Sequence, residues 1–112
     1  MNIGEKEYHI SHEKGVIRIC GRLTIMNEEY EEIRALLEKI VESEPHEITL
    51  DIRDLELLNS PGIKTLAVDL ILGAADREGL RMKILCSNRY TWQKETIPTF
   101  EHLMDGMEIV FE

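Results

Sequence analysis

The residue types that most often carry chemistry are present in this chain, but their spacing does not build a reactive site. The four histidines are scattered, and none has a cysteine or carboxylate at ligand spacing: His9, His12, His46 and His102. His9 and His12 lie three residues apart in a strand-like segment, which places them on opposite faces. The sequence has no G-x-S-x-G elbow, no P-loop and no G-x-G-x-x-G loop. We therefore expect no catalytic residue, no metal site and no cofactor, and a protein that is not an enzyme.

Ser60 is the side chain whose setting does suggest chemistry. Serine is a favoured N-cap and proline is favoured at the first helical position, so Ser60-Pro61-Gly62 predicts a helix start. There the hydroxyl would accept a hydrogen bond from the backbone N–H of Gly62 or Ile63. A phosphate on Ser60 would face those N–H groups and the positive end of the helix dipole, and Lys64 could approach it. Capping alone, worth ~1 kcal/mol over alanine, also explains a serine here.

The helix that follows Ser60 has two apolar faces. One is a nearly continuous stripe expected to face the core, made of Ile63, Leu66, Ala67, Leu70, Ile71 and Ala74. Val68 and Leu72 point away from this stripe, and Thr65 falls beside them. Outward apolar side chains next to a modifiable serine are typical of a surface that binds another protein. A helix buried on two sides, or scattered surface apolar residues, would give the same pattern, and self-association through this face is a further alternative.

The elements that must position this helix follow from periodicity. Alternating apolar residues on both sides of Gly15 predict a β-hairpin, with Tyr8 and Ile10 on one face. Asn27 is a favoured N-cap, and the helix that it begins must end at Pro45. The remaining expected elements are a strand at 47–52, a loop at 53–59, the helix from Ser60 to about Gly79, a strand at 82–86, a helical stretch from about Asn88 to Gly106 that Pro98 interrupts, and a strand at 107–111.

The predicted order is β-β-α-β-α-β-α-β, in one domain that spans residues 1–112. Because strands alternate with helices in the second half, we expect parallel strands with right-handed crossovers there. The fold class is therefore α/β, with a mixed sheet of four to five strands and helices packed mainly on one face.

Composition argues against several classes of function. Of 112 residues, 13 are basic and 22 are acidic, for a net charge of −9. This charge repels nucleic acid and anionic membranes, although four basic residues lie between positions 81 and 94. Apolar runs are too short to cross a bilayer, and residues 1–13 carry glutamates where a signal peptide would be apolar. Cys20 and Cys86 are too few for a disulfide framework, so we expect a cytoplasmic protein.

The segment from Leu50 to Leu66 resembles the signature of STAS domains, the family of bacterial anti-sigma-factor antagonists. In that family a strand ending in Asp is followed by a helix start of the form Asp-Ser-x-Gly, which continues as Gly-Ile/Leu-x-x-Leu. Here the strand ends in Leu50-Asp51-Ile52, and Asn59-Ser60-Pro61-Gly62-Ile63 stands at the helix start. Gly21-Arg22-Leu23 is similar to the family's Gly-x-Leu before its first helix, and the predicted element order matches the same fold over most of the chain.

This resemblance implies a phosphorylation switch. In antagonists of the family, a dedicated serine kinase that is also the anti-sigma factor modifies the serine that matches Ser60, and a metal-dependent phosphatase reverses the modification. Asn59 replaces the family's Asp, and Pro61 replaces its second small residue, so the chain departs from the family pattern on both sides of the serine.

Two functions from different classes follow. In the first, the chain is a signalling module that binds a serine-kinase or anti-sigma-type protein under control of phosphorylation at Ser60. The residues expected to contact that partner are Asn59, Lys64, Thr65, Val68, Leu72, Leu57 and Leu58. In the second, which the departures at Asn59 and Pro61 motivate, the chain is a constitutive assembly or scaffold subunit, for example of a regulatory or transporter complex, without phosphorylation.

Overall fold

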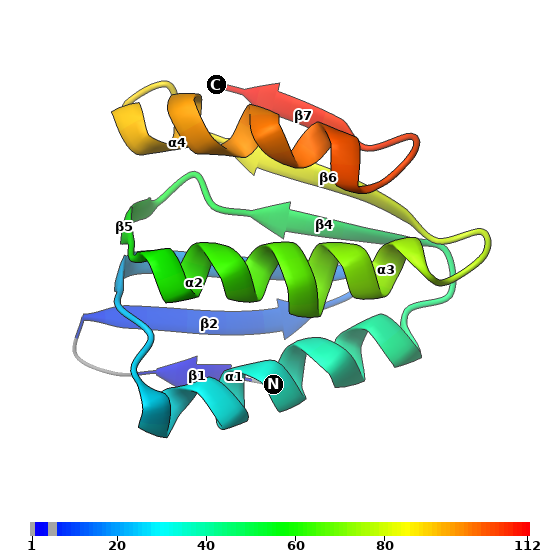
Figure 1. Ribbon diagram of the computed structural model, residues 1–112, viewed down its shortest axis with the longest axis horizontal. Helices are drawn as coiled ribbons and strands as arrows, with labels where there is room; N and C mark the ends of the chain where they lie inside the picture. Colours follow the sequence, from blue (N-terminus) through cyan, green and yellow to red (C-terminus); the bar gives the residue numbers. More distant parts are fainter. Residues whose placement is uncertain (1, 5–6) are drawn as a thin grey trace.

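The computed structural model describes residues 2–4 and 7–112, which form a mixed β-sheet with its helices on one face (Figure 1). The strands are β1 (Asn2–Gly4), β2 (Tyr8–Glu13), β3 (Val16–Leu23), β4 (Glu47–Asp51), β5 (Leu55–Leu58), β6 (Arg81–Cys86) and β7 (Glu108–Phe111). Their order in the sheet is β1-β2-β3-β4-β6-β7, and β5 pairs separately with β3. The β1-β2-β3 pairs are antiparallel and the other pairs are parallel, as the alternating second half of the sequence predicts.

The sheet has more strands than the four to five that the sequence predicts, because β1 and β5 are additional. The predicted loop at 53–59 is wrong for Leu55–Leu58, which form β5. The cause is the length of β3: its residues 16–18 pair with β4, and a register shift at Gly21 leaves 21–23 for β5. Pairing with a distant strand therefore orders a segment that has no alternating pattern of its own.

The first helix, α1 (Asn27–Ser43), ends before Pro45 as predicted. Asn27 is its first residue and not its N-cap, which corrects the prediction. Met26 holds the extended cap conformation, and its N–H donates to the carboxylate of Glu29 at 3.3 Å. The glutamate in the first turn therefore supplies the capping contact at this end of the helix.

Two further helical regions complete the layer. We name the first the 60–75 helix, which runs without a break through α2 (Ser60–Thr65), a π-helical segment η1 (Leu66–Leu72) and α3 (Gly73–Ala75). The second consists of α4 (Thr91–Thr96) and the 3-10 helix η2 (Ile97–Leu103), so it begins at Thr91 and not near Asn88, and Pro98 stands at the start of its 3-10 part. In Figure 1 the 60–75 helix lies between α1 and α4.

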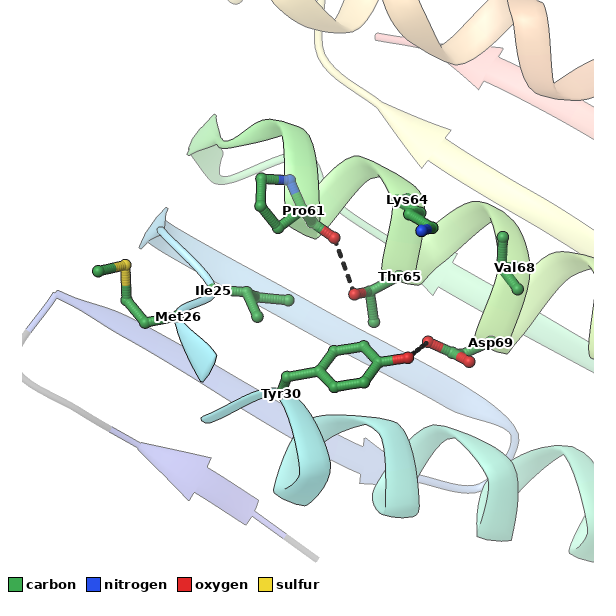
Figure 2. A pocket seen from close by; sticks show the side chains of 8 residues that line it. All are labelled: Ile25, Met26, Tyr30, Pro61, Lys64, Thr65, Val68 and Asp69. Atoms are coloured by element: carbon green, nitrogen blue, oxygen red, sulfur yellow. Dashed lines mark hydrogen bonds between the residues drawn. The ribbon is translucent and has the colours of Figure 1, made fainter. Parts of the chain in front are cut away.

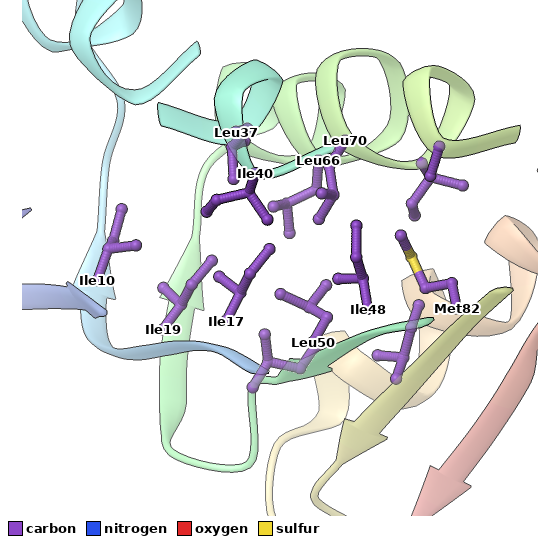
Figure 3. Packing of buried hydrophobic residues seen from close by; sticks show 14 of the residues in the cluster. Ile10, Ile17, Ile19, Leu37, Ile40, Ile48, Leu50, Leu66, Leu70 and Met82 are labelled. Atoms are coloured by element: carbon purple, nitrogen blue, oxygen red, sulfur yellow. The ribbon is translucent and has the colours of Figure 1, made fainter. Parts of the chain in front are cut away.

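The core fills the space between the sheet and these helices (Figure 3). Ile17 and Leu50 come from the central strands, and Leu37 of α1 packs over them from the helical layer. The inward stripe predicted for the 60–75 helix is confirmed: Leu66, Leu70, Ile71 and Ala74 are buried, and Ile63 and Ala67 are partly buried. In the hairpin, Tyr8 and Ile10 both face this core, as predicted.

Both cysteines are free thiols. Cys86 belongs to the core, where burial and the nearby carboxylate of Asp51 raise the pKa of its thiol to about 12. Cys20 is half-buried, and its Sγ donates to the carbonyl oxygen of His9 at 3.8 Å. In the described part of the chain, no helix has the length and apolar character needed to cross a membrane.

Gln93 of α4 joins the helical layer to the segment that leads into β5. The side chain is fully buried, and its Nε2 donates to the carbonyl oxygens of Ile52 (2.8 Å) and Leu55 (2.9 Å). Its Oε1 accepts from the N–H of Ser87 at 2.8 Å. The indole N–H of Trp92 donates to the same Leu55 carbonyl at 3.3 Å. Two neighbouring side chains of α4 therefore fix β5, and with it the approach to the 60–75 helix.

We expect Gln93→Leu to lower the free energy of unfolding by about 2 kcal/mol, because it leaves the Ser87 N–H buried without an acceptor and removes a donor from two carbonyls. Urea unfolding followed by circular dichroism measures the difference. Lys94→Met, at the exposed neighbouring position, is the matched control and should change stability by less than about 0.5 kcal/mol. Equal stability of the two variants would contradict the role given to Gln93.

Candidate functional site

Asn59 is the N-cap of the 60–75 helix, a position that the sequence analysis gives to Ser60. Its Oδ1 accepts a hydrogen bond from the N–H of Gly62 at 2.9 Å. The same oxygen accepts from the N–H of Ile25 at 3.1 Å, while Nδ2 donates to the carbonyl oxygen of Ile25 at 3.1 Å. The Asn59 carbonyl oxygen also accepts from the N–H of Ile63 at 2.9 Å. This one residue therefore starts the helix and holds the segment between β3 and α1 against it.

Ser60 is consequently the first residue of the helix, and the prediction that its hydroxyl caps Gly62 or Ile63 is wrong. Asn59 already supplies the acceptors for both N–H groups. The reason is that a carboxamide has an acceptor and a donor on separate atoms. It can therefore cap the helix and also bind both the N–H and the C=O of Ile25, which the single oxygen of a hydroxyl is less suited to do. Ser60 is exposed, so its hydroxyl is open to a modifying enzyme.

Four residues follow one another at four-residue steps along the exposed side of this helix, and we name them the outer ridge: Ser60, Lys64, Val68 and Leu72. The side chains of Val68 and Leu72 are 45% and 40% exposed, which confirms that they point away from the core. The outer ridge thus combines a hydroxyl, a cation and two apolar side chains on one surface.

A groove of about 220 Å³ runs beside the outer ridge, where the 60–75 helix meets the start of α1 (Figure 2). Its lining consists of Pro61, Lys64, Thr65, Val68 and Asp69 on the 60–75 helix, and of Ile25, Met26 and Tyr30 on the opposite side. The Tyr30 hydroxyl donates to Oδ2 of Asp69 at 3.2 Å and so joins the two walls. Partial burial and the Asp69 carboxylate raise the pKa of Tyr30 above the ordinary value of a phenol.

Two residues predicted to contact a partner are buried: Thr65 offers only the small part of its surface that lines the groove, and Leu58 lies beneath the helix start. Thr65 is 1% exposed, because it lies on the side of the helix that faces α1, and its hydroxyl donates to the Pro61 carbonyl at 2.8 Å. Leu58 is buried beneath the helix start, where a Cβ at Gly62 would approach its Cδ1 to 2.3 Å. Asn59 is half-buried and commits its carboxamide to the hydrogen bonds described above.

The exposed members of the predicted surface are Lys64, Val68, Leu72 and Leu57. The sequence analysis missed the far wall of the groove, to which Met26 contributes the largest exposed apolar side chain, 62% exposed. No sequence signal marked Met26, because Asn27 is the favoured N-cap there and Met26 then belongs to the preceding loop. Ile25 and Tyr30 gave no signal either, because apolar residues around a helix start are ordinarily core.

Asp51, at the end of β4, makes a structural contact with Arg53. Its carboxylate is 7% exposed and accepts from Nε and Nη2 of Arg53 at 3.0 and 2.9 Å. Burial opposes ionisation, but the hydrogen bonds and charge of Arg53 outweigh it and hold the pKa of Asp51 below its usual value. Across residues 2–4 and 7–112, no three metal-ligating side chains come together. His9 is exposed, while Nε2 of His12 lies 3.3 Å from Oε1 of Glu44.

Comparison with known proteins gives matches at the level of structure. No protein-family model and no curated protein matches the chain. SiaC of Pseudomonas aeruginosa matches with a TM-score of 0.71 at 15% identity, covering 100% of this chain and 98% of the SiaC chain. A chain in the crystal structure of the diguanylate cyclase SiaD in complex with its activator SiaC, from the same organism, matches with a TM-score of 0.72 at 16% identity, covering 100% and 99%. Apo-SiaC from the same organism matches with a TM-score of 0.71 at 14% identity, covering 100% of this chain and 97% of the SiaC chain. At these identities the likeness establishes the fold, an α/β domain with a mixed sheet and helices, as predicted.

We expect Asn59→Ala to lower the free energy of unfolding by about 2 to 3 kcal/mol, because it removes the helix cap and both contacts with Ile25. Asn59→Asp keeps the acceptors, but it loses the donor to the Ile25 carbonyl and should cost about 1 kcal/mol. Urea unfolding at neutral pH measures both, with Asn88→Ala at an exposed position as the control. An aspartate variant as stable as the parent would refute this account of the substitution.

Proposed function

We propose that this chain is a non-enzymatic cytoplasmic signalling protein that binds a partner protein through the outer ridge and the adjacent groove. Phosphorylation of Ser60 by a serine kinase controls the binding, and a phosphatase restores the unmodified form. The observation that carries this proposal is the placement of an exposed serine and two exposed apolar side chains, Val68 and Leu72, on the same side of one helix.

The distribution of exposed apolar side chains supports binding at this place. In the described part of the chain, the large exposed apolar residues are Val16, Met26, Leu57, Val68 and Leu72. Met26 and Val68 line the groove, Leu72 continues the outer ridge, and Leu57 precedes Ser60 by three residues. An apolar groove flanked by exposed apolar residues is suited to receive side chains of another protein.

The position of Ser60 supports control by phosphorylation. A phosphate adds about −1.5 to −2 charges at pH 7. At one end of the outer ridge this charge would have to lose its water when an apolar partner surface covers the ridge, which is costly without a compensating charge. The modified form should therefore bind such a partner more weakly.

Two kinds of partner are the first to test. SiaC is named as the activator of the diguanylate cyclase SiaD, and this chain shares the fold of SiaC, so a diguanylate cyclase of the host is one. The other is an anti-sigma-type serine kinase, which the resemblance to STAS antagonists implies. With either partner, the chain would bind through the outer ridge and would act without catalytic groups of its own.

Asn59 favours a second candidate function, a constitutive assembly subunit. Antagonists of the STAS family have Asp at this place, whereas the carboxamide here is bound to Ile25 and Gly62 and has no carboxylate to offer a kinase. In this case the outer ridge binds its partner permanently, and the charge state of Ser60 does not affect the affinity.

Val68→Glu should weaken binding to the partner at least about tenfold, because it places a charge in the centre of the proposed contact surface. Isothermal titration calorimetry with a purified host diguanylate cyclase measures the affinity, and a pull-down from the host with the parent chain identifies other partners. Val16→Glu changes another exposed valine, on β3, and should bind within about twofold of the parent. If Val68→Glu binds as the parent does, the outer ridge is not the contact surface.

Incubation with the host serine kinase and ATP should add one phosphate to the parent and none to Ser60→Ala, as measured by intact mass. Ser60→Asp should bind the partner more weakly than the parent, because its carboxylate also places a charge on the outer ridge. If Ser60→Asp and the parent bind the partner with equal affinity, the phosphorylation switch is wrong and the constitutive assembly subunit is favoured. The proposed binding surface would still stand.

A further inference from the structure

The first turn of the 60–75 helix has few backbone donors left for a phosphate on Ser60. The side chain of Asn59 accepts from the N–H of Gly62, and its backbone oxygen accepts from the N–H of Ile63. Pro61 has no N–H. The amides that ordinarily hold an anion at a helix start are therefore occupied by hydrogen bonds within the fold.

The same turn is packed too tightly to release those amides. A Cβ at Gly62 would lie 2.3 Å from Cδ1 of Leu58, so the backbone passes directly over a buried side chain. Asn59 is also tied to both polar groups of the Ile25 backbone, so moving its carboxamide away would break three side-chain hydrogen bonds, two at Oδ1 and one at Nδ2. A phosphate at the neighbouring exposed position has no comparable contacts to offer in exchange.

Lys64 is the cation that Ser60 can reach. It stands one helical turn further on the outer ridge, where side chains at i and i+4 are neighbours with Cβ atoms ≈ 5–6 Å apart. It is exposed, and among the described residues it takes part in no ion pair, whereas Arg18, Arg34, Arg53 and Arg89 all do. Its ammonium group is thus available without breaking an existing contact.

We infer that phosphorylation of Ser60 leaves the helix start unchanged and acts at the surface, with Lys64 as the positioning residue that holds the phosphate. This inference rests on the proposed modification of Ser60 and specifies how the modified state is read. Because Lys64 also lines the groove, its engagement with the phosphate withdraws a cation from the surface that the partner covers. The switch is then a rearrangement of surface charge and does not require a change of fold.

The test uses the full chain with phosphoserine incorporated at position 60 during synthesis, so that neither kinase nor partner is needed. Phosphorus NMR gives the second pKa of the phosphate in the parent and in Lys64→Gln, Lys64→Arg and Lys39→Gln. A nearby cation stabilises the dianion, so the pKa in the parent and in Lys64→Arg should lie about 0.2 to 0.4 below that of Lys64→Gln. Lys39→Gln removes an exposed lysine of α1 and should match the parent, and 1 M salt should remove the difference.

A second measurement tests the helix start itself. Hydrogen exchange at the amide of Gly62 should differ by less than about threefold between the phosphorylated and unmodified chains, because its bond to Asn59 persists. The inference is overturned if Lys64→Gln has the phosphate pKa of the parent, or if phosphorylation removes the protection of Gly62. Neither result contradicts the proposal that a partner binds through Val68, which the calorimetry tests separately. Conversely, the phosphate pKa and the exchange at Gly62 can be measured even if no partner binds.

Discussion

The hydrogen bonds of the Asn59 carboxamide are the constraint on which the surface of this protein depends. They join two segments that are 34 residues apart in the sequence, the approach to α1 and the start of the 60–75 helix. A single planar group satisfies the N–H and C=O of Ile25 together with the N–H of Gly62. Because Asn59 is the N-cap, Ser60 is the first residue of the helix. Its side chain is exposed and is not needed to cap the backbone N–H groups.

Further contacts hold α1 and the 60–75 helix together along their length. The Tyr30 hydroxyl reaches Asp69 in the π-helical segment. At the far end, the guanidinium of Arg77 donates to the carbonyl oxygens of Val41 and Glu44, the latter at 2.8 Å, which satisfies groups left open at the end of α1. The two helices are thus joined at their start, middle and end. The groove between them is a fixed feature of the fold, which a partner can use without first ordering it.

Features that depend on local periodicity could be predicted from the sequence, and features that depend on distant partners could not. The hairpin, α1, the order of the main elements along the chain and the outward direction of Val68 and Leu72 all follow from spacing along the chain. β5 could not be predicted, because it exists only where β3 extends beyond the residues that pair with β4. The choice of Asn59 over Ser60 as cap was equally hidden, since both are good caps and only the unpaired backbone of Ile25 decides between them. Thr65 is buried against α1 and Leu58 beneath the start of the 60–75 helix, and the spacing of residues along the chain does not predict either contact.

The outer edge of the sheet at β7 has a consequence for how other proteins can approach. This strand is four residues long, begins with the exposed Glu108, and is followed at once by Glu112. Short edge strands bracketed by charge resist the addition of a further strand from another chain. Lateral growth of the sheet, whether by aggregation or by capture of an extended peptide, is therefore discouraged on this side. A partner that approaches from this side must therefore contact side chains and not the free backbone groups of an edge strand.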